Sequence, residues 1–301
     1  MARDRLRGKR YDEPKLNLKK VFGVLIALAV IVMIIISIVN IVKGSDKKVE
    51  VKNYTYYTSY KAGKFGVINN FGETVIEPTY KELIAIPNNS KAIFVCIYDV
   101  DDEAGTYKTK VINDKNEEIL NGYDRIEAID NFDSKQNIWY EDNILRVAKD
   151  GKYGLIDFNG NEVLSCDYDE ITALNGVKSN ILVKKAGNIG LVNEKGQTII
   201  PTQYKEIKTL KEGYKNEYII VNEENLYGLI STTGAILLEP KYEGVKYLNS
   251  SNLFAIKESG VWKLINVQDG NILIDGGYED ILEAKTENIV IKKDGKERNR
   301  I

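Results

Sequence analysis

The side chains that could do chemistry in this 301-residue chain are mainly carboxylates, tyrosines and two cysteines. Histidine is absent from the sequence, which excludes His-dependent triads, His general bases and His-containing metal sites. Cys96 and Cys166 could form at most one disulfide, and as free thiols they would act as small hydrophobic residues. We therefore assign no catalytic residue, no cofactor and no metal ligand from the sequence.

An acidic run, DVDDE, occupies residues 99–103. Its carboxylates are of the kind that bind calcium, but Ala104 stands where an EF-hand loop has glycine, and Lys110 stands where it has glutamate. We expect this run to form the solvated tip of a hairpin.

A second polar stretch, NFDSKQNIWYED, places Phe132, Trp139 and Tyr140 among charged and amide residues. It lies within 130–148, which with 86–106 forms the two insertions into an otherwise regular repeat. Insertions into repeats map to loops, often on the binding face, and exposed aromatic residues are frequent hot spots. We predict that Phe132, Trp139 and Tyr140 bind a protein or a sugar. The alternative, that they cap the core of a neighbouring unit, remains open at this stage.

The elements that must position these residues recur along the chain. The stretch KFGVINNFG at 64–72 returns as KYGLIDFNG at 152–160, as NIGLVNEKG at 188–196 and as LYGLISTTG at 226–234. Alignment on this motif gives six units, each with an apolar pair, a turn, a second apolar segment and a tyrosine. These tyrosines are Tyr80, Tyr123, Tyr168, Tyr204, Tyr242 and Tyr278. Their spacings of 36 to 45 residues are typical of repeat architectures.

Each unit reads as a hairpin of short strands with a further strand before it. The glycine that ends each turn, such as Gly160, supplies the positive φ that tight hairpins need, and Asn116 takes this place in the second unit. The glycine beside the aromatic residue, such as Gly154, lies within a strand and indicates a bend or a close backbone approach.

A single unit of this kind cannot bury both faces of its apolar residues, whereas neighbouring units can share a core. We therefore predict an all-β repeat domain of six units with about four short antiparallel strands each. A β-propeller-like arrangement is the first expectation for this domain, and an open β-solenoid is the alternative.

Over roughly residues 51–300 the sequence resembles the bacterial WG-repeat family. The resemblance rests on the ordered recurrence of the aromatic-Gly pair, the apolar run, the glycine turn and the tyrosine tail. Here Phe, Tyr or Ile replaces the tryptophan before glycine, Trp262 is followed by Lys263, and Thr109 with Lys110 lacks both signature residues. The resemblance implies a β-rich repeat protein that binds partners and has no shared catalytic residues.

The N-terminal part of the chain has the composition of a membrane anchor. Residues 21–42 are uncharged and apolar, and as a helix they would extend roughly 33 Å, which is enough to cross a bilayer. Eight Lys or Arg residues lie within 1–20, so the positive-inside rule keeps this tail in the cytoplasm. We predict a cytoplasmic basic tail at 1–20, one transmembrane helix at 21–42, a linker at 43–52 and an extracytoplasmic repeat domain at 53–301.

These features favour a single-pass cell-membrane protein whose repeat domain is a binding or scaffold module. An envelope protein or a wall glycan is its expected partner, and the acidic balance of the chain outside its tail disfavours nucleic acid. Two alternatives remain at the level of sequence. One is a carboxylate-dependent glycan hydrolase, and the other is a transmembrane sensor that signals through its basic tail.

Overall fold

A computed structural model describes residues 55–86, 91–213, 216–248, 252–285 and 288–300. Every regular element in these ranges is a β-strand, as the repeat pattern predicts. The predicted membrane span at 21–42 lies outside the described residues. Within the ranges given, no helix has the length and apolar character that crossing a membrane requires.

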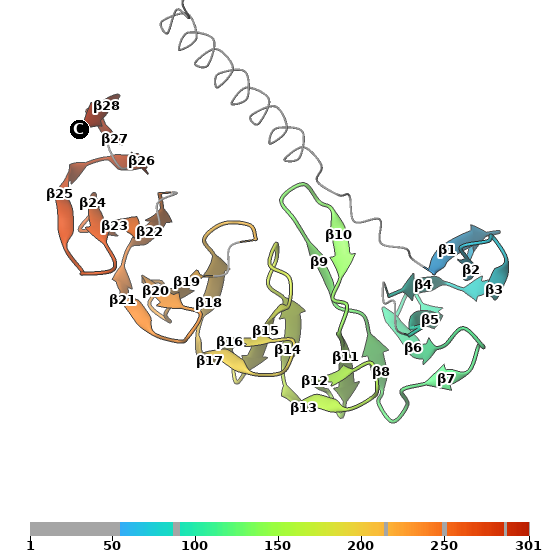
Figure 1. The fold of residues 1–301 in the computed structure, drawn as a ribbon. Coiled ribbons are helices and arrows are strands. Elements are labelled where there is room, and N and C mark those ends of the chain that lie inside the picture. Colours follow the sequence, from blue (N-terminus) through green and yellow to red (C-terminus); the bar gives the residue numbers. More distant parts are fainter. Residues whose placement is uncertain (1–54, 87–90, 214–215, 249–251, 286–287, 301) are drawn as a thin grey trace, which may run out of the picture. The chain divides into compact units, whose positions relative to one another are not determined.

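Seven sheets that follow one another along the chain make up the repeat region (Figure 1). The first three sheets are β1 (Tyr56–Lys61), β2 (Lys64–Asn69) and β3 (Thr74–Tyr80); β4 (Glu82–Ala85), β5 (Phe94–Asp101), β6 (Thr106–Ile112) and β7 (Glu118–Ile119); and β8 (Arg125–Glu127), β11 (Ile144–Lys149), β12 (Lys152–Asp157) and β13 (Glu162–Tyr168). The fourth and fifth are β14 (Glu170–Ala173), β15 (Asn180–Lys185), β16 (Asn188–Asn193) and β17 (Thr198–Tyr204); and β18 (Glu206–Thr209), β19 (Glu217–Val221), β20 (Tyr227–Ser231) and β21 (Ile236–Tyr242). The last two are β22 (Gly244–Tyr247), β23 (Leu253–Glu258), β24 (Val261–Asn266) and β25 (Ile272–Tyr278); and β26 (Asp280–Lys285), β27 (Asn288–Lys293) and β28 (Lys296–Arg300).

The sheets and the sequence repeat are out of phase with each other. Most of the repeated tyrosines end one sheet, and the next sheet begins two residues later, as between Tyr168 and Glu170. Five sheets therefore have four strands, whereas the first and the last have three. The sequence predicted six units because alignment on the hairpin motif divides each sheet between two units.

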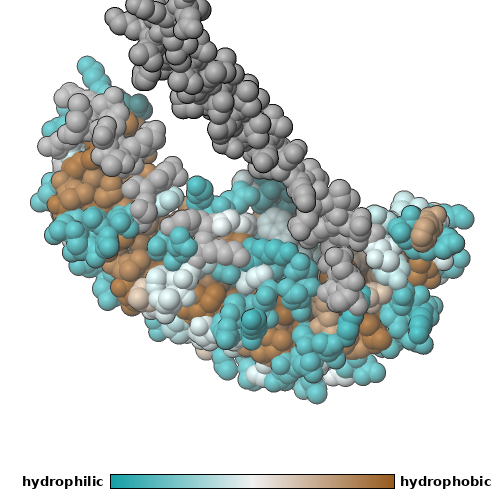
Figure 2. All heavy atoms as spheres, in the orientation of Figure 1, coloured by the Kyte–Doolittle hydropathy of each residue, from teal (hydrophilic) through white to brown (hydrophobic). Residues whose placement is uncertain are grey.

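The hydrophobic core lies between adjacent sheets, which confirms that neighbouring units share their burial. The cluster between the third and fourth sheets consists of Ile129, Ile144, Leu155, Ile171, Ala173, Ile181, Val183 and Val192. Similar clusters join each of the other neighbouring pairs. In the space-filling view, hydrophobic residues form separate patches along the sheets among hydrophilic ones (Figure 2). Each sheet thus depends on its neighbours for burial.

The apolar pair on the third strand of a sheet serves both neighbours. In the third sheet, Leu155 packs toward the fourth sheet, and Ile156 packs toward the second. Both side chains are fully buried, and burying a side chain of this size contributes about 1.5–3 kcal/mol. The motif repeats because every inner sheet needs one apolar residue for each face.

The two glycines of the motif have different roles. A Cβ atom at Gly154 would lie 2.6 Å from the carbonyl oxygen of Leu164, at a register shift between β12 and β13. The strand glycine therefore permits a close backbone approach, as the sequence predicted. At the turn, Gly160 has a φ of +84°, and Asn116 takes the same left-handed conformation in the second sheet with a φ of +61°.

No strand pairing joins the first sheet to the last, and no closed barrel or propeller is found, among the residues that the structure describes. What is established is an all-β array of short antiparallel strands. Cys96 is buried and Cys166 is half-buried, and both thiols are free.

Candidate functional site

The regular array is interrupted between β8 and β11 by an extra hairpin. Its strands are β9 (Asp130–Phe132) and β10 (Ile138–Tyr140), which pair with each other as a separate two-stranded sheet (Figure 1). The sequence predicted a loop here, but Phe132 pairs with Ile138 and Tyr140 pairs with Asp130. The insertion is therefore an ordered structure, which we call the inserted hairpin (residues 130–140).

The turn of the inserted hairpin is organised by one carboxylate. Asp133 Oδ1 accepts hydrogen bonds from the backbone N–H groups of Lys135 and Asn137, both at 2.8 Å. Its Oδ2 accepts a third from the side-chain amide of Asn137 at 2.7 Å. These bonds, led by the one from the Asn137 side chain, hold the pKa of Asp133 below its ordinary value.

Asn131 attaches the base of the hairpin to the fourth sheet. Its side chain is fully buried, and its amide donates to the carbonyl oxygens of Leu174 at 3.4 Å and Val177 at 3.2 Å. Asn131 Oδ1 accepts from the N–H of Gly176 at 3.1 Å. One amide side chain thus pairs three backbone groups of the β14–β15 connection.

Glu141 completes the same attachment. Its carboxylate is 1% exposed and accepts hydrogen bonds from the N–H of Ser179 at 2.9 Å and from the Asn131 amide at 3.1 Å. Buried polar groups of this kind are costly unless they are paired, so the hairpin and the β14–β15 connection hold one fixed relation. We call Asn131 and Glu141 the hairpin clamp.

The tip of the hairpin reaches the fifth sheet. The Ser134 hydroxyl donates to Glu212 Oε2 at 2.6 Å, and Glu212 lies in the β18–β19 connection. In the same region the N–H of Gly213 donates to the carbonyl oxygen of Gly176 at 2.9 Å. The insertion therefore begins in the third sheet and contacts the next two.

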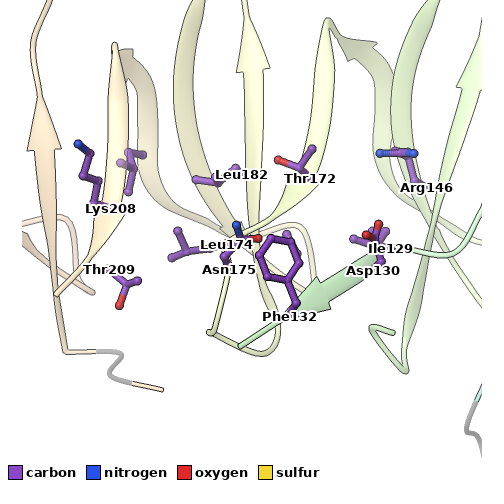
Figure 3. Close-up of a pocket in the computed structure, with 12 residues that line it drawn as sticks. Ile129, Asp130, Phe132, Arg146, Thr172, Leu174, Asn175, Leu182, Lys208 and Thr209 are labelled. Carbon is purple, nitrogen blue, oxygen red and sulfur yellow. The ribbon is translucent and has the colours of Figure 1, made fainter. Parts of the chain in front are cut away.

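A cavity of about 470 Å³ lies between the inserted hairpin and the first strands of the fourth and fifth sheets (Figure 3). Its lining residues are Ile129, Asp130, Phe132, Arg146, Thr172, Ala173, Leu174, Asn175, Leu182, Ile207, Lys208 and Thr209. A second cavity of about 310 Å³ shares Phe132, Asn175 and Thr209 with the first and extends toward Glu212. We call the two cavities together the hairpin groove. Each has a volume within the range of small-ligand sites.

Both cations of the groove are paired within the protein. Arg146 donates to the Glu127 carboxylate at 2.9 Å through Nε and to the carbonyl oxygen of Ile171 at 2.9 Å. Lys208 lies 3.0 Å from Glu206. Tyr107 also donates to Glu127 at 2.6 Å, and this hydrogen bond raises the pKa of the Tyr107 hydroxyl. The positive charge in the groove is consequently balanced by neighbouring carboxylates.

Three polar side chains of the groove remain available to a ligand. In the part of the chain that the structure describes, Asp130, Thr172 and Asn175 have no side-chain hydrogen bond to the protein. Asp130 and Asn175 are exposed, and Thr172 is half-buried. They supply a carboxylate acceptor, a hydroxyl and an amide. No group of three or more Cys, Asp or Glu residues within the described ranges is arranged to hold a metal ion.

The structure does not bring the three aromatic residues predicted from the sequence to one point. Phe132 lines both cavities of the groove. Tyr140 is half-buried against the cluster between the second and third sheets, and burial raises the pKa of its hydroxyl. Trp139 is also half-buried, and its indole nitrogen has no hydrogen-bond partner among the described residues. Of the three, Phe132 is the residue in position to touch a ligand in the groove.

Sequence reasoning missed the other residues that build the groove. Arg146 interrupts the apolar strand ILRVAK, and that interruption was a usable signal. Asn131 and Glu141 flank the aromatic stretch, but nothing in the sequence shows that they are buried. Thr172 and Lys208 occupy equivalent positions of β14 and β18, which only the strand register makes evident.

The acidic run at 99–103 lies at the β5–β6 hairpin, as predicted. Asp101 Oδ1 accepts from the N–H groups of Glu103 and Ala104, both at 3.0 Å. Asp99 pairs with Lys108 at 2.5 Å. These carboxylates serve the turn itself.

Comparison with solved structures gives weak likenesses. A eukaryotic initiation factor is 8% identical, with 80% of this chain and 79% of that chain covered and a TM-score of 0.31. Apo AztD from Citrobacter koseri is 10% identical, with 72% and 70% covered and a TM-score of 0.32. Hsv2p of Kluyveromyces lactis is 9% identical, with 80% and 86% covered and a TM-score of 0.30. TM-scores of this size do not establish a shared fold, and no curated protein matches the sequence.

A family model gives a clearer result. The WG containing repeat matches residues 65–96, 153–188, 189–227 and 227–262. Each match begins at the residue before a strand glycine, namely Phe65, Tyr153, Ile189 or Tyr227. No match begins at Thr109 or Trp262, where lysine replaces that glycine. These four segments of the chain are therefore similar to the WG containing repeat.

Proposed function

We propose that the chain is a membrane-anchored binding module that holds a partner in the hairpin groove. The observation that carries this proposal is the inserted hairpin, which is fixed to the fourth sheet by the buried clamp of Asn131 and Glu141. Regular sheets need no such hairpin for burial, because their apolar pairs, such as Leu191 with Val192, already serve both neighbours. A structural element that is fixed in place beside a cavity, as the inserted hairpin is, is a feature of a preorganised binding site.

The anchor is part of the same proposal and is supported by the sequence. The uncharged span at 21–42 follows a tail with eight basic residues, which favours a cytoplasmic N-terminus and an exported repeat domain. An envelope protein or a wall glycan of a bacterium would then be within reach of the groove. Protease treatment of intact cells should digest the repeat domain and spare an N-terminal tag. Digestion of the tag with protection of the repeats would contradict this topology.

Ligand capture tests the binding site itself. The full chain, purified in detergent, would serve as bait for solubilised envelope, and both protein and glycan would be identified by mass spectrometry. Phe132→Ala removes the aromatic side chain of the groove, whereas Phe71→Ala removes an exposed ring from a turn of the first sheet. We expect a ligand that wild type and Phe71→Ala retain and Phe132→Ala loses. Equal retention by all three proteins would overturn the assignment of the groove.

A further inference from the structure

We infer that the hairpin groove binds a short stretch of a neutral, polyhydroxylated chain, that is, a glycan without phosphate or sulfate groups. This inference rests on the proposed function of the same site and adds the chemical class of the ligand. Four features carry it: the continuity of the groove, its aromatic ring, its free polar groups and its charge.

The groove is lined by residues of three consecutive sheets and of the inserted hairpin. Its two cavities, of about 470 and 310 Å³, share Phe132, Asn175 and Thr209, so they adjoin at these residues. The first cavity also includes Arg146 of the third sheet, and the second also includes Glu212 of the β18–β19 connection. A linear ligand that passes Phe132 would occupy both cavities at once.

The backbone of Phe132 is held in place at that junction. The backbone N–H of Phe132 donates to Asn131 Oδ1 at 2.8 Å, and Asn131 is itself fully buried in the hairpin clamp. In Figure 3 the ring lies between Lys208 and Arg146 and beside Leu174 and Asn175. An aromatic ring on this anchored backbone offers a flat apolar face, on which the C–H face of a sugar ring can stack.

The free polar groups around the ring complement hydroxyl groups. Asp130 can only accept hydrogen bonds when ionised, whereas Thr172 and Asn175 can both donate and accept. Sugar hydroxyls also donate and accept, so each of the three side chains has a possible partner on a glycan. An apolar chain would leave all three without partners, which disfavours a lipid tail.

The charge of the groove disfavours an anionic polymer. Arg146 and Lys208 are paired with Glu127 and Glu206. Three further carboxylates, those of Asp130, Asp133 and Glu212, line the two cavities. A ligand rich in phosphate or sulfate would meet a surplus of negative charge and no free cation in the groove as described.

The test measures the binding of defined oligosaccharides to the full chain in detergent. Saturation-transfer NMR detects the binding, and titration gives the affinity. The probes are chitotetraose, cellotetraose and maltotetraose, with dextran sulfate as the anionic comparison. We expect at least one neutral probe to bind and dextran sulfate not to bind in the groove. Phe132→Ala should weaken the binding by about tenfold or more, because stacking is lost.

Two further variants separate a lost contact from a lost fold. Thr172→Val keeps the shape of β14 and removes one hydroxyl, so it should weaken binding by about two- to tenfold. Phe71→Ala should leave the affinity unchanged, since Phe71 is 80% exposed in the β2–β3 turn and lines neither cavity of the groove. Binding that neither Phe132→Ala nor Thr172→Val alters would overturn the inference.

The outcomes also distinguish this inference from the proposed function. If the envelope yields a protein or peptide that depends on Phe132 while no neutral probe binds, the proposed function stands and the glycan inference fails. A preference for dextran sulfate over all neutral probes would likewise leave the proposed function standing and overturn the glycan inference. If neither envelope material nor any probe depends on Phe132, both fail.

Discussion

The fourth, fifth and sixth sheets, which we call the regular sheets, differ from the third sheet and its insertion in the polarity of their buried side chains. In the three regular sheets, the buried side chains that the structure describes are apolar except for Asn180, which donates to the Tyr218 hydroxyl of the next sheet. Around the third sheet, by contrast, Glu127, Asn131 and Glu141 are buried polar residues. The comparison indicates that repetition serves packing, whereas the interruption builds a site.

The largest expected effect comes from breaking the packing of the regular pattern. Leu155→Ala should lower the free energy of unfolding by about 2–5 kcal/mol, because the side chain is fully buried between the third and fourth sheets. Leu273→Ala is the matched control, since Leu273 is 53% exposed, and it should change stability by less than about 0.5 kcal/mol. Urea unfolding of the full chain measures both. Equal effects of the two substitutions would contradict the assignment of the core.

Breaking the hairpin clamp should have a smaller and more local effect. Asn131→Ala leaves the carboxylate of Glu141 and the N–H of Gly176 without their buried partner, which costs about 1–3 kcal/mol. We expect the inserted hairpin to become sensitive to limited proteolysis while the regular sheets stay resistant.

Asn143→Ala serves as the control for this substitution, because Asn143 is exposed and its side-chain bonds go to Asp142 and Glu194. In Asn143→Ala the inserted hairpin should resist the protease as it does in wild type. If the inserted hairpin of Asn131→Ala is equally resistant, the clamp does not hold the hairpin.

The reactivities of the two cysteine thiols report on burial in the second and third sheets, and measuring them requires no substitution. Burial raises the pKa of the Cys96 thiol to about 12, so at pH 8 about one thiol in ten thousand is ionised. Burial also raises the pKa of Cys166, but this residue is only half-buried. Iodoacetamide should therefore modify Cys166 well before Cys96, as followed by mass spectrometry. Faster modification of Cys96 would place it outside the core.

The smallest expected effect is a pH response of the inserted hairpin. The folded pKa of Asp133 lies below the unfolded value of about 3.9. The resulting stabilisation is present above the unfolded value and is lost as the pH falls through the folded pKa. The protection factors of the turn amides, which correct for the intrinsic pH dependence of exchange, should fall over this acidic range in wild type. In Asp133→Asn this fall should be absent, and its persistence would assign the response to another group.

The sequence predicted the strands because each one is short, apolar and bounded by a turn residue. Hydrophobic pattern and backbone chemistry sufficed to predict the burial of Leu155 and Ile156 and the roles of the glycines at 154 and 160. It could not predict the sheet boundaries, because a tyrosine such as Tyr168 ends one sheet only two residues before the next begins.

Of the candidate site, the sequence located the insertion and Phe132 but not the groove. The groove depends on contacts between residues about 40 to 80 positions apart, such as Asn131 with Val177 and Ser134 with Glu212. Such contacts follow from how consecutive sheets pack, and no local pattern encodes them. For the same reason, the sequence grouped Trp139 and Tyr140 with Phe132 by proximity along the chain.

The most direct test of the account is hydrogen–deuterium exchange of the full chain in detergent, with and without solubilised envelope material. The account predicts that the ligand slows exchange in residues 130–140, 172–176 and 207–212, which line the hairpin groove, and leaves the sixth sheet unchanged. Protection elsewhere in the repeat domain, with none in these three segments, would contradict the claim that the interruption of the repeat builds the binding site.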